Sequence, residues 1–225
     1  MQPHNYITIA TSAEGQFKDR GSKFLAFAQP CFTEDEAKQT VAMFRAEHPS
    51  AVHHCYAYRL GADGLNQRSS DDGEPGGTAG RPIMGQILSN NLTNIIIVVV
   101  RYYGGTPLGV PGLINAYKTA TNEAIAAAQL IEKQVEAQYA ITFAYAQQGD
   151  VMRILKEKGI DIRSLQIEES CKATFSLPKS QAEQVLQRLK NLQNIQLTDY
   201  WLPTTDYYDK HPTFKNTLHP TRSIG

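Results

Sequence analysis

The alternation of apolar and polar residues predicts a first series of strands and helices in the N-terminal 133 residues. The strand expected at 95–100 is β-branched throughout, which is typical of a strand buried on both faces. Thr33 and Glu36 form a capping box, a common start of a helix. The expected elements are strands at 22–30, 52–60 and 95–100 and helices at 33–49, 82–88 and from 112 onward.

A second series begins near residue 134, where charged residues cluster and the strand alternation restarts. Its order is β-α-β-β-α-β, the split-βαβ or ferredoxin-like arrangement. The sequence therefore predicts an α+β fold of two domains, 1–133 and 134–202, followed by an extended tail at 203–225. The expected elements are strands at 135–145, 161–168, 171–177 and 196–202 and helices at 149–158 and 179–192.

The charge balance excludes one class of nucleic-acid binder. Lys and Arg total 22, as do Asp and Glu, so the chain lacks the excess of positive charge with which polybasic proteins neutralise phosphates. A local basic patch remains compatible with this balance. The N-terminus has no signal-peptide pattern, and the longest aliphatic run is six residues, whereas a membrane span needs ~20. Three cysteines without a CxxC pair favour a reducing, cytoplasmic location.

The first candidate binding segment follows the buried strand and contains several of the chain's glycines. A glycine-lined turn into a helix exposes backbone N–H groups that suit a phosphate, although the segment matches neither a Walker loop nor GxGxxG. The alternative is that the glycines only supply positive φ and close packing. The candidate residues are Arg101, Tyr102, Tyr103, Gly104, Gly105, Gly109, Gly112 and Lys118.

The second candidate segment carries three carboxylates in four positions, which suits Mg²⁺ binding or acid–base chemistry. We favour the alternative, turn chemistry, because adjacent carboxylates rarely aim at one point. Both segments are rich in glycine and flank the helix expected at 82–88, so we expect 71–80 and 101–112 to be neighbours that form one face. The candidate residues are Arg68, Ser70, Asp71, Asp72, Glu74, Gly77 and Thr78.

His53, His54 and Cys55 allow a zinc site or a Cys–His pair to be considered. Zinc needs three or four ligands, and only His48 is near in sequence. We therefore favour a buried cysteine and hydrogen-bonded histidines, and we expect no metal.

Three blocks of the sequence closely resemble the signature blocks of the YigZ/IMPACT family: HHCYAYRLG at 53–61, RSSDDGEPGGTAGRPI at 68–83 and NIIIVVVRYYGGTPLGVPGLINAY at 94–117. The resemblance implies a first domain similar to the second domain of a small-subunit ribosomal protein and to domain IV of elongation factor G. It implies a second, ferredoxin-like domain similar to the C-terminal domain of elongation factor G. It also implies eukaryotic relatives that regulate translation by competing for the activator of a starvation kinase.

The chain departs from the family pattern in the last block. Pro107, Pro111 and Asn115 stand where the family commonly has Lys, Gly and Arg. Two cationic side chains are therefore absent from this segment, while the turn at Gly104 and Gly105 is retained.

Three functions are compatible with these residues. The one that we favour is a non-enzymatic binding protein of the translation apparatus, with RNA or a ribosome-associated protein as partner and no membrane contact. The second is an enzyme or binder of a small-molecule or phosphate ligand that uses Asp71, Asp72 and Glu74. The third is a protein–protein adaptor. No nucleophile–base pair is evident, so we assign no catalytic residue and expect no cofactor.

Arg101 is the central residue of the favoured function. It ends the buried strand beside two tyrosines, so its guanidinium can pair with a phosphate while a ring stacks on the neighbouring base. The alternative is that Arg101 pairs internally with Asp71, Asp72 or Glu74 and holds the two segments together.

Overall fold

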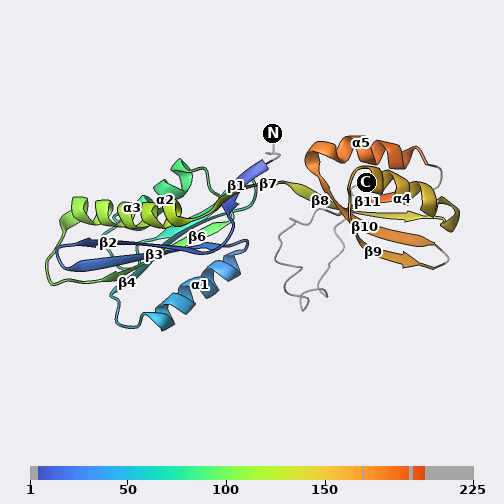
Figure 1. The fold of residues 1–225 in the computed structure, drawn as a ribbon. Coiled ribbons are helices and arrows are strands. Elements are labelled where there is room, and N and C mark those ends of the chain that lie inside the picture. Colours follow the sequence, from blue (N-terminus) through green and yellow to red (C-terminus); the bar gives the residue numbers. More distant parts are fainter. Residues whose placement is uncertain (1–4, 169, 193–194, 201–225) are drawn as a thin grey trace. The chain divides into compact units, whose positions relative to one another are not determined.

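The computed structural model describes residues 5–168, 170–192 and 195–200, and its contacts divide the chain into two compact units, Met1–Gln134 and Val135–Gly225 (Figure 1). The architecture is mixed, with helices and several sheets, as expected. The tail expected at 203–225 lies outside the described residues. No helix among the described residues is long and apolar enough to cross a membrane.

Unit 1 is built on an antiparallel sheet whose central strand is β6 (Ile95–Tyr102). The side chains of β6 alternate between two cores: Ile95, Ile97 and Val99 enter one, and the residues between them enter the other. This double burial explains why the strand is apolar throughout. In order, the strands are β2 (Ala13–Asp19), β3 (Ser22–Pro30), β6, β4 (His53–Leu60) and β5 (Asn66–Ser70).

Three helices cover the two faces of this sheet. Figure 1 shows α1 (Glu34–Glu47) on one face and α2 (Gly80–Ser89) and α3 (Gly109–Ala127) on the other. The Thr33 hydroxyl accepts from the Glu36 amide at 3.2 Å, while the Glu36 carboxylate accepts from Phe32 rather than from Thr33.

Helices α2 and α3 begin two and three residues earlier than the sequence predicts. Their prolines, Pro82 and Pro111, therefore lie at the third helical position rather than at or before the first. The first turn of a helix tolerates proline because its N–H groups have no partner within the helix.

Several strands of unit 1 are absent from the sequence-based prediction. β1 (Asn5–Ile9) pairs antiparallel with β7 (Leu130–Gln134), and β2 and β5 form the edges of the larger sheet. The side chains of β5 are exposed except for the half-buried Ser70, so it lacks the apolar alternation that marks a strand. In β2, position 15 is occupied by glycine, because the backbone of α3 lies too close to leave room for a Cβ atom.

Unit 2 has the predicted order of elements, and its sheet is antiparallel with the strand order β11-β8-β10-β9. Its core contains Ile141, Phe143, Phe175 and Val185, among others. Gly159 has a φ of +64° just after the end of α4, where the turn requires it. The elements are β8 (Glu136–Phe143), η1 (Tyr145–Gln147), α4 (Gln148–Glu157), β9 (Ile162–Ile167), β10 (Cys171–Pro178), α5 (Lys179–Lys190) and β11 (Gln196–Tyr200).

Candidate functional site

The two glycine-rich segments meet at a buried ion pair. Arg101 Nη1 lies 2.6 Å from Glu74 Oε1, and the two side chains are 7% and 3% exposed. The Tyr117 hydroxyl donates to the same carboxylate oxygen at 2.8 Å. The segments 71–80 and 101–112 are therefore neighbours, held together from the inside.

The three clustered carboxylates point in three directions. Asp71 accepts from backbone amides of its own loop, Asp72 accepts from the His54 amide and from Arg45, and Glu74 faces Arg101. Within the part of the chain that the structure describes, no three His, Cys, Asp or Glu side chains are grouped to hold a metal ion. Asp71 stabilises its own loop, whereas Asp72 and Glu74 join the loop to other elements of unit 1.

Asp71 caps α2 from a distance. Its carboxylate accepts from the amides of Gly77, Ala79 and Gly80 at 2.8, 3.0 and 2.8 Å. Burial by itself raises the pKa of Asp71, but these hydrogen bonds outweigh burial and hold the pKa below its ordinary value. The protein's own carboxylate thus occupies the anion position at this helix N-terminus.

The remaining polar residues of this loop also stabilise its turns. The Thr78 hydroxyl donates to the Pro75 carbonyl at 2.7 Å, and the Ser70 hydroxyl accepts from the Asp72 amide at 3.3 Å. Gly77 has a φ of +78°, which a residue with a side chain rarely adopts. The Ser70 and Thr78 hydroxyls thus stabilise the loop conformation in which Glu74 faces Arg101.

Arg101 forms the internal pair that the sequence offered as the alternative to phosphate binding. Its guanidinium is enclosed by Glu74 and by the rings of Phe24 and Tyr103, at 5.4 and 5.6 Å from their centroids. Arg101 is buried because it lies on the same face of β6 as Val99, against the core under α2 and α3. It therefore supports Tyr103, whose residue surface is 50% exposed.

The glycine-rich turn after β6 combines close packing with an open surface. The backbone of Gly104 approaches Gly21 too closely for a Cβ atom, and its amide donates to the Ser22 hydroxyl at 3.1 Å. Gly105 and Gly109 have φ of +82° and +70° and are exposed. The glycines thus meet the conformational demands of the turn while leaving part of its backbone open to solvent.

The other candidates of this segment differ in accessibility. The Tyr102 hydroxyl lies 2.9 Å from His48 Nδ1, on the α1 side of the sheet, and away from Tyr103. Gly112 is half-buried in the first turn of α3, and Lys118 is exposed further along the same helix. Of the side chains proposed for this segment, those of Tyr103 and Lys118 remain available to a partner.

In the His53–Cys55 segment, Cys55 is buried and His53 is hydrogen-bonded, whereas His54 Nε2 is buried without a hydrogen-bond partner among the described residues. Cys55 Sγ lies 3.0 Å from the Asp71 carbonyl oxygen and 3.2 Å from the Tyr117 hydroxyl oxygen, the two acceptors within reach of its single S–H. Burial raises the pKa of this thiol strongly. His53 Nδ1 lies 2.7 Å from the Asp72 carbonyl oxygen. Burial lowers the pKa of His54, outweighing the carboxylate of Asp72. A thiol kept protonated in this way is a poor nucleophile.

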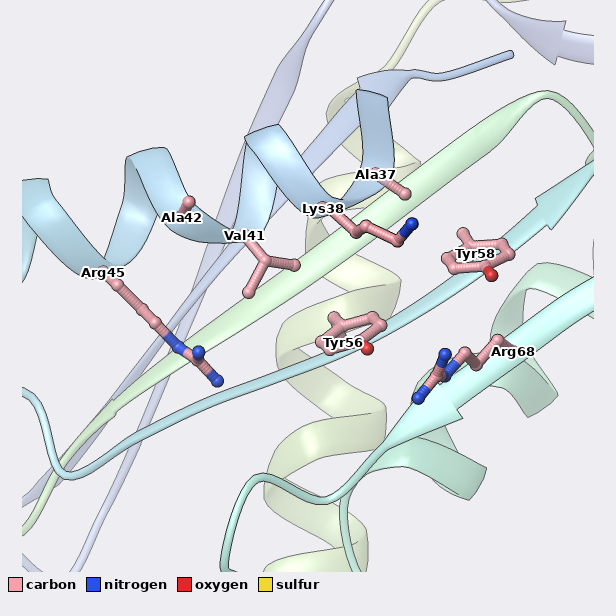
Figure 2. Close-up of a pocket in the computed structure, with 8 residues that line it drawn as sticks. All are labelled: Ala37, Lys38, Val41, Ala42, Arg45, Tyr56, Tyr58 and Arg68. Atoms are coloured by element: carbon pink, nitrogen blue, oxygen red, sulfur yellow. The ribbon is translucent and has the colours of Figure 1, made fainter. Parts of the chain in front are cut away.

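A second site lies on the opposite face of the sheet, and sequence reasoning found only one of its residues, Arg68. It is a hollow of about 380 Å³ between α1, β4 and β5 (Figure 2). Spacing along α1 and alternation along β4 signal two stripes separately, but the sequence does not show that they face each other. The lining residues are Ala37, Lys38, Val41, Ala42, Arg45, Tyr56, Tyr58 and Arg68.

Comparisons with known proteins match most of this chain. The family model described as the Impact N-terminal domain matches residues 20–125. The IMPACT family member YigZ of Escherichia coli (strain K12) is 38% identical over 60% of this chain and 67% of its own. An IMPACT family member of Haemophilus influenzae is 35% identical over 71% and 78%. A solved structure titled "Crystal structure of an hypothetical protein" is 29% identical, with a TM-score of 0.69 over 88% of this chain and 98% of that one.

Proposed function

Because the chain belongs to the IMPACT family, we propose that it is a non-enzymatic binding protein of the translation apparatus that contacts RNA through one face of unit 1. We call this surface the glycine-rich face; it comprises Tyr103, Gly104, Gly105, Gly109 and Lys118. The family resemblance supports a role in translation, since it implies eukaryotic members that regulate translation. The accessibility of these five residues supports the choice of surface.

The observation that carries the proposal is the position of Tyr103. Its ring is half exposed, yet its inner side lies over the Arg101 guanidinium, which Glu74 holds in place. An aromatic ring fixed in this way can stack on an unpaired base with little loss of side-chain freedom. Lys118 adds one exposed positive charge on α3 for the phosphate backbone.

The enzyme alternative has less support. The carboxylates of Asp71, Asp72 and Glu74 are each engaged by groups of the protein. A general base must reach a proton of the substrate, and Glu74 has a side chain only 3% exposed.

The proposal extends to the two domains. We propose that 1–133 is a domain similar to domain IV of elongation factor G and that 134–202 is a ferredoxin-like domain. The strand order of unit 2 and its two helices support the second assignment. Both types of domain occur in translation factors, as the family resemblance implies.

The test is the affinity of the full chain for a fluorescently labelled stem–loop RNA with an unpaired loop, measured at 50 and 200 mM salt. Tyr103→Ala is expected to weaken binding about five- to hundredfold, the range for loss of one base stack. Lys118→Gln is expected to make the salt dependence shallower. The matched control is Tyr145→Ala, which removes an exposed tyrosine of unit 2. No measurable RNA affinity of the wild type, or equal loss in both tyrosine variants, contradicts the proposal.

A further inference from the structure

The hollow on the α1 face has the size and the walls of a ligand site. Its volume of about 380 Å³ lies in the range of about 300–1,000 Å³ that small-molecule sites occupy. Ala37, Val41 and Ala42 give α1 an apolar wall, and Tyr56 and Tyr58 give β4 an aromatic one. Figure 2 shows the two tyrosines side by side below the helix.

Three cationic side chains line this hollow, and none of the lining residues in the described part of the chain is a carboxylate. Figure 2 shows Lys38 and Arg45 extending from α1 and Arg68 extending from β5, with Tyr56 between the two arginines. Arg68 makes no ion pair or side-chain hydrogen bond with any other described residue. An uncompensated guanidinium beside an aromatic ring favours an anion that also carries a flat group.

Three carboxylates act on residues that line the hollow: Glu34 acts on Lys38 and Tyr58, Asp35 on Lys38, and Asp72 on Arg45. None of the three forms an ion pair with Arg68 among the described residues. Lys38 pairs with Asp35 at 2.9 Å, and the two side chains are 69% and 83% exposed. Arg45 pairs with Asp72 at 2.6 Å, and the two side chains are 53% and 23% exposed. An ion pair as exposed as that of Lys38 contributes little net free energy, so Lys38 can turn to a ligand at small cost.

The aromatic wall distinguishes a nucleotide from other anions. The rings of Tyr56 and Tyr58 are nearly parallel, at 11°, with centroids 6.5 Å apart. Tyr58 is nearly buried and the half-buried Tyr56 is the more accessible of the two. A carboxylate-rich peptide would use the three cations but would leave this flat apolar surface without a partner.

We propose that the hollow binds one nucleotide, with Arg68 on its phosphate and Tyr56 against its base. Lys38 and Arg45 add positive charge on the helix side. The inference rests on the proposed function where the nucleotide is part of an RNA strand, and it stands without that function where the nucleotide is free. The nucleotide can thus belong to an RNA strand or be free in solution, and the experiment distinguishes the two.

The experiment measures binding of adenosine monophosphate by calorimetry and of the labelled stem–loop RNA by anisotropy, both with the full chain. Arg68→Gln and Tyr56→Ala are each expected to weaken adenosine monophosphate binding about five- to tenfold, as expected for loss of a charge-assisted hydrogen bond or a stacking contact. The matched control is Lys18→Gln, which removes one exposed charge from β2 at the other edge of the same sheet. Melting temperatures verify that all variants fold.

The outcomes distinguish the inference about the hollow from the proposed RNA-binding function. If Arg68→Gln lowers the affinity for both adenosine monophosphate and RNA, and Lys18→Gln lowers neither affinity, the hollow binds a nucleotide of RNA. If adenosine monophosphate alone depends on Arg68, the hollow binds a free nucleotide. If RNA binding needs Tyr103 while neither ligand depends on Arg68 and Tyr56, the inference is overturned and the proposed function stands. Equal effects of Arg68→Gln and Lys18→Gln, or tighter binding of polyglutamate than of adenosine monophosphate, overturn the inference.

Discussion

The two faces of the sheet in unit 1 carry the same kinds of charged side chain in opposite environments. On the face under α2 and α3, Arg101 and Glu74 form a pair whose side chains are 7% and 3% exposed. On the face under α1, Arg68 lines an open hollow and forms no ion pair with any residue that the structure describes. The comparison teaches that burial decides whether an arginine serves the fold or remains available to a ligand.

The largest expected effect on stability comes from removing the buried charge of Arg101. Arg101→Gln leaves Glu74 buried without its cation and is expected to destabilise unit 1 by about 3–5 kcal/mol. Arg101→Lys, which keeps the charge, is expected to cost less. Chemical denaturation measures both.

A double-mutant cycle with Glu74→Gln tests the pairing itself. The double variant is expected to be less destabilised than the sum of the two single variants, because neither charge is then left alone. Additive effects contradict the internal pair.

The next effect concerns a carboxylate on the same side as Arg101. Asp71→Asn removes the charge that accepts three backbone amides, so we expect a loss of about 1–3 kcal/mol in the free energy of unfolding. The control is Glu123→Gln, an exposed acid on α3, with an expected change within about 0.5 kcal/mol. Similar losses in the two variants would show that the cap of α2 contributes nothing.

The stability of the fold is also expected to depend on pH through Asp71 and His54. The pKa of Asp71 is lowered on folding, so its contribution is present above the ordinary value of 3.8 and is lost as the pH falls below it. The pKa of His54 is lowered by burial, so the folded state favours the neutral ring. Its contribution is lost earlier, as the pH falls below the ordinary value of 6.5.

We therefore expect the stability of the wild type to decrease from pH 7 to pH 5 and the slope to be smaller in His54→Asn. Denaturant titrations at several pH values measure this slope. Asp72, Arg45 and His48 also act on His54, and Asp72→Asn serves as the comparison because it removes the carboxylate that opposes the effect of burial. An unchanged slope in His54→Asn contradicts the assignment.

The smallest expected effect is on the α1 face. Arg68→Gln is expected to change the free energy of unfolding by less than about 0.5 kcal/mol, in contrast to Arg101→Gln. Denaturation of the two variants under the same conditions measures the difference. A loss from Arg68→Gln as large as that from Arg101→Gln would remove the distinction between the two faces.

The sequence predicts most elements of the fold because their signals are local. The alternation in β4, the β-branched run of β6 and the capping Thr33 each act within a few residues. Edge strands such as β5 escape prediction because exposed polar residues extend there only through pairing with β4. The start of α2 also differs from the prediction, since Asp71 accepts from the amides of Ala79 and Gly80, which lie eight and nine residues further along the chain.

The candidate site likewise has features that the sequence predicts and features that depend on tertiary packing. The residue pattern alone was enough to predict the glycine-rich turns, the three blocks shared with the family and the nearness of the two segments that flank α2. The internal position of Arg101 became evident from the packing of the chain, because its partner Glu74 lies 27 residues away. The tertiary structure also decided the hollow, which brings Lys38, Tyr56 and Arg68 from three elements to one place. The physical reason is that burial and charge pairing depend on which segments pack together, and the spacing of residues along a chain does not specify that packing.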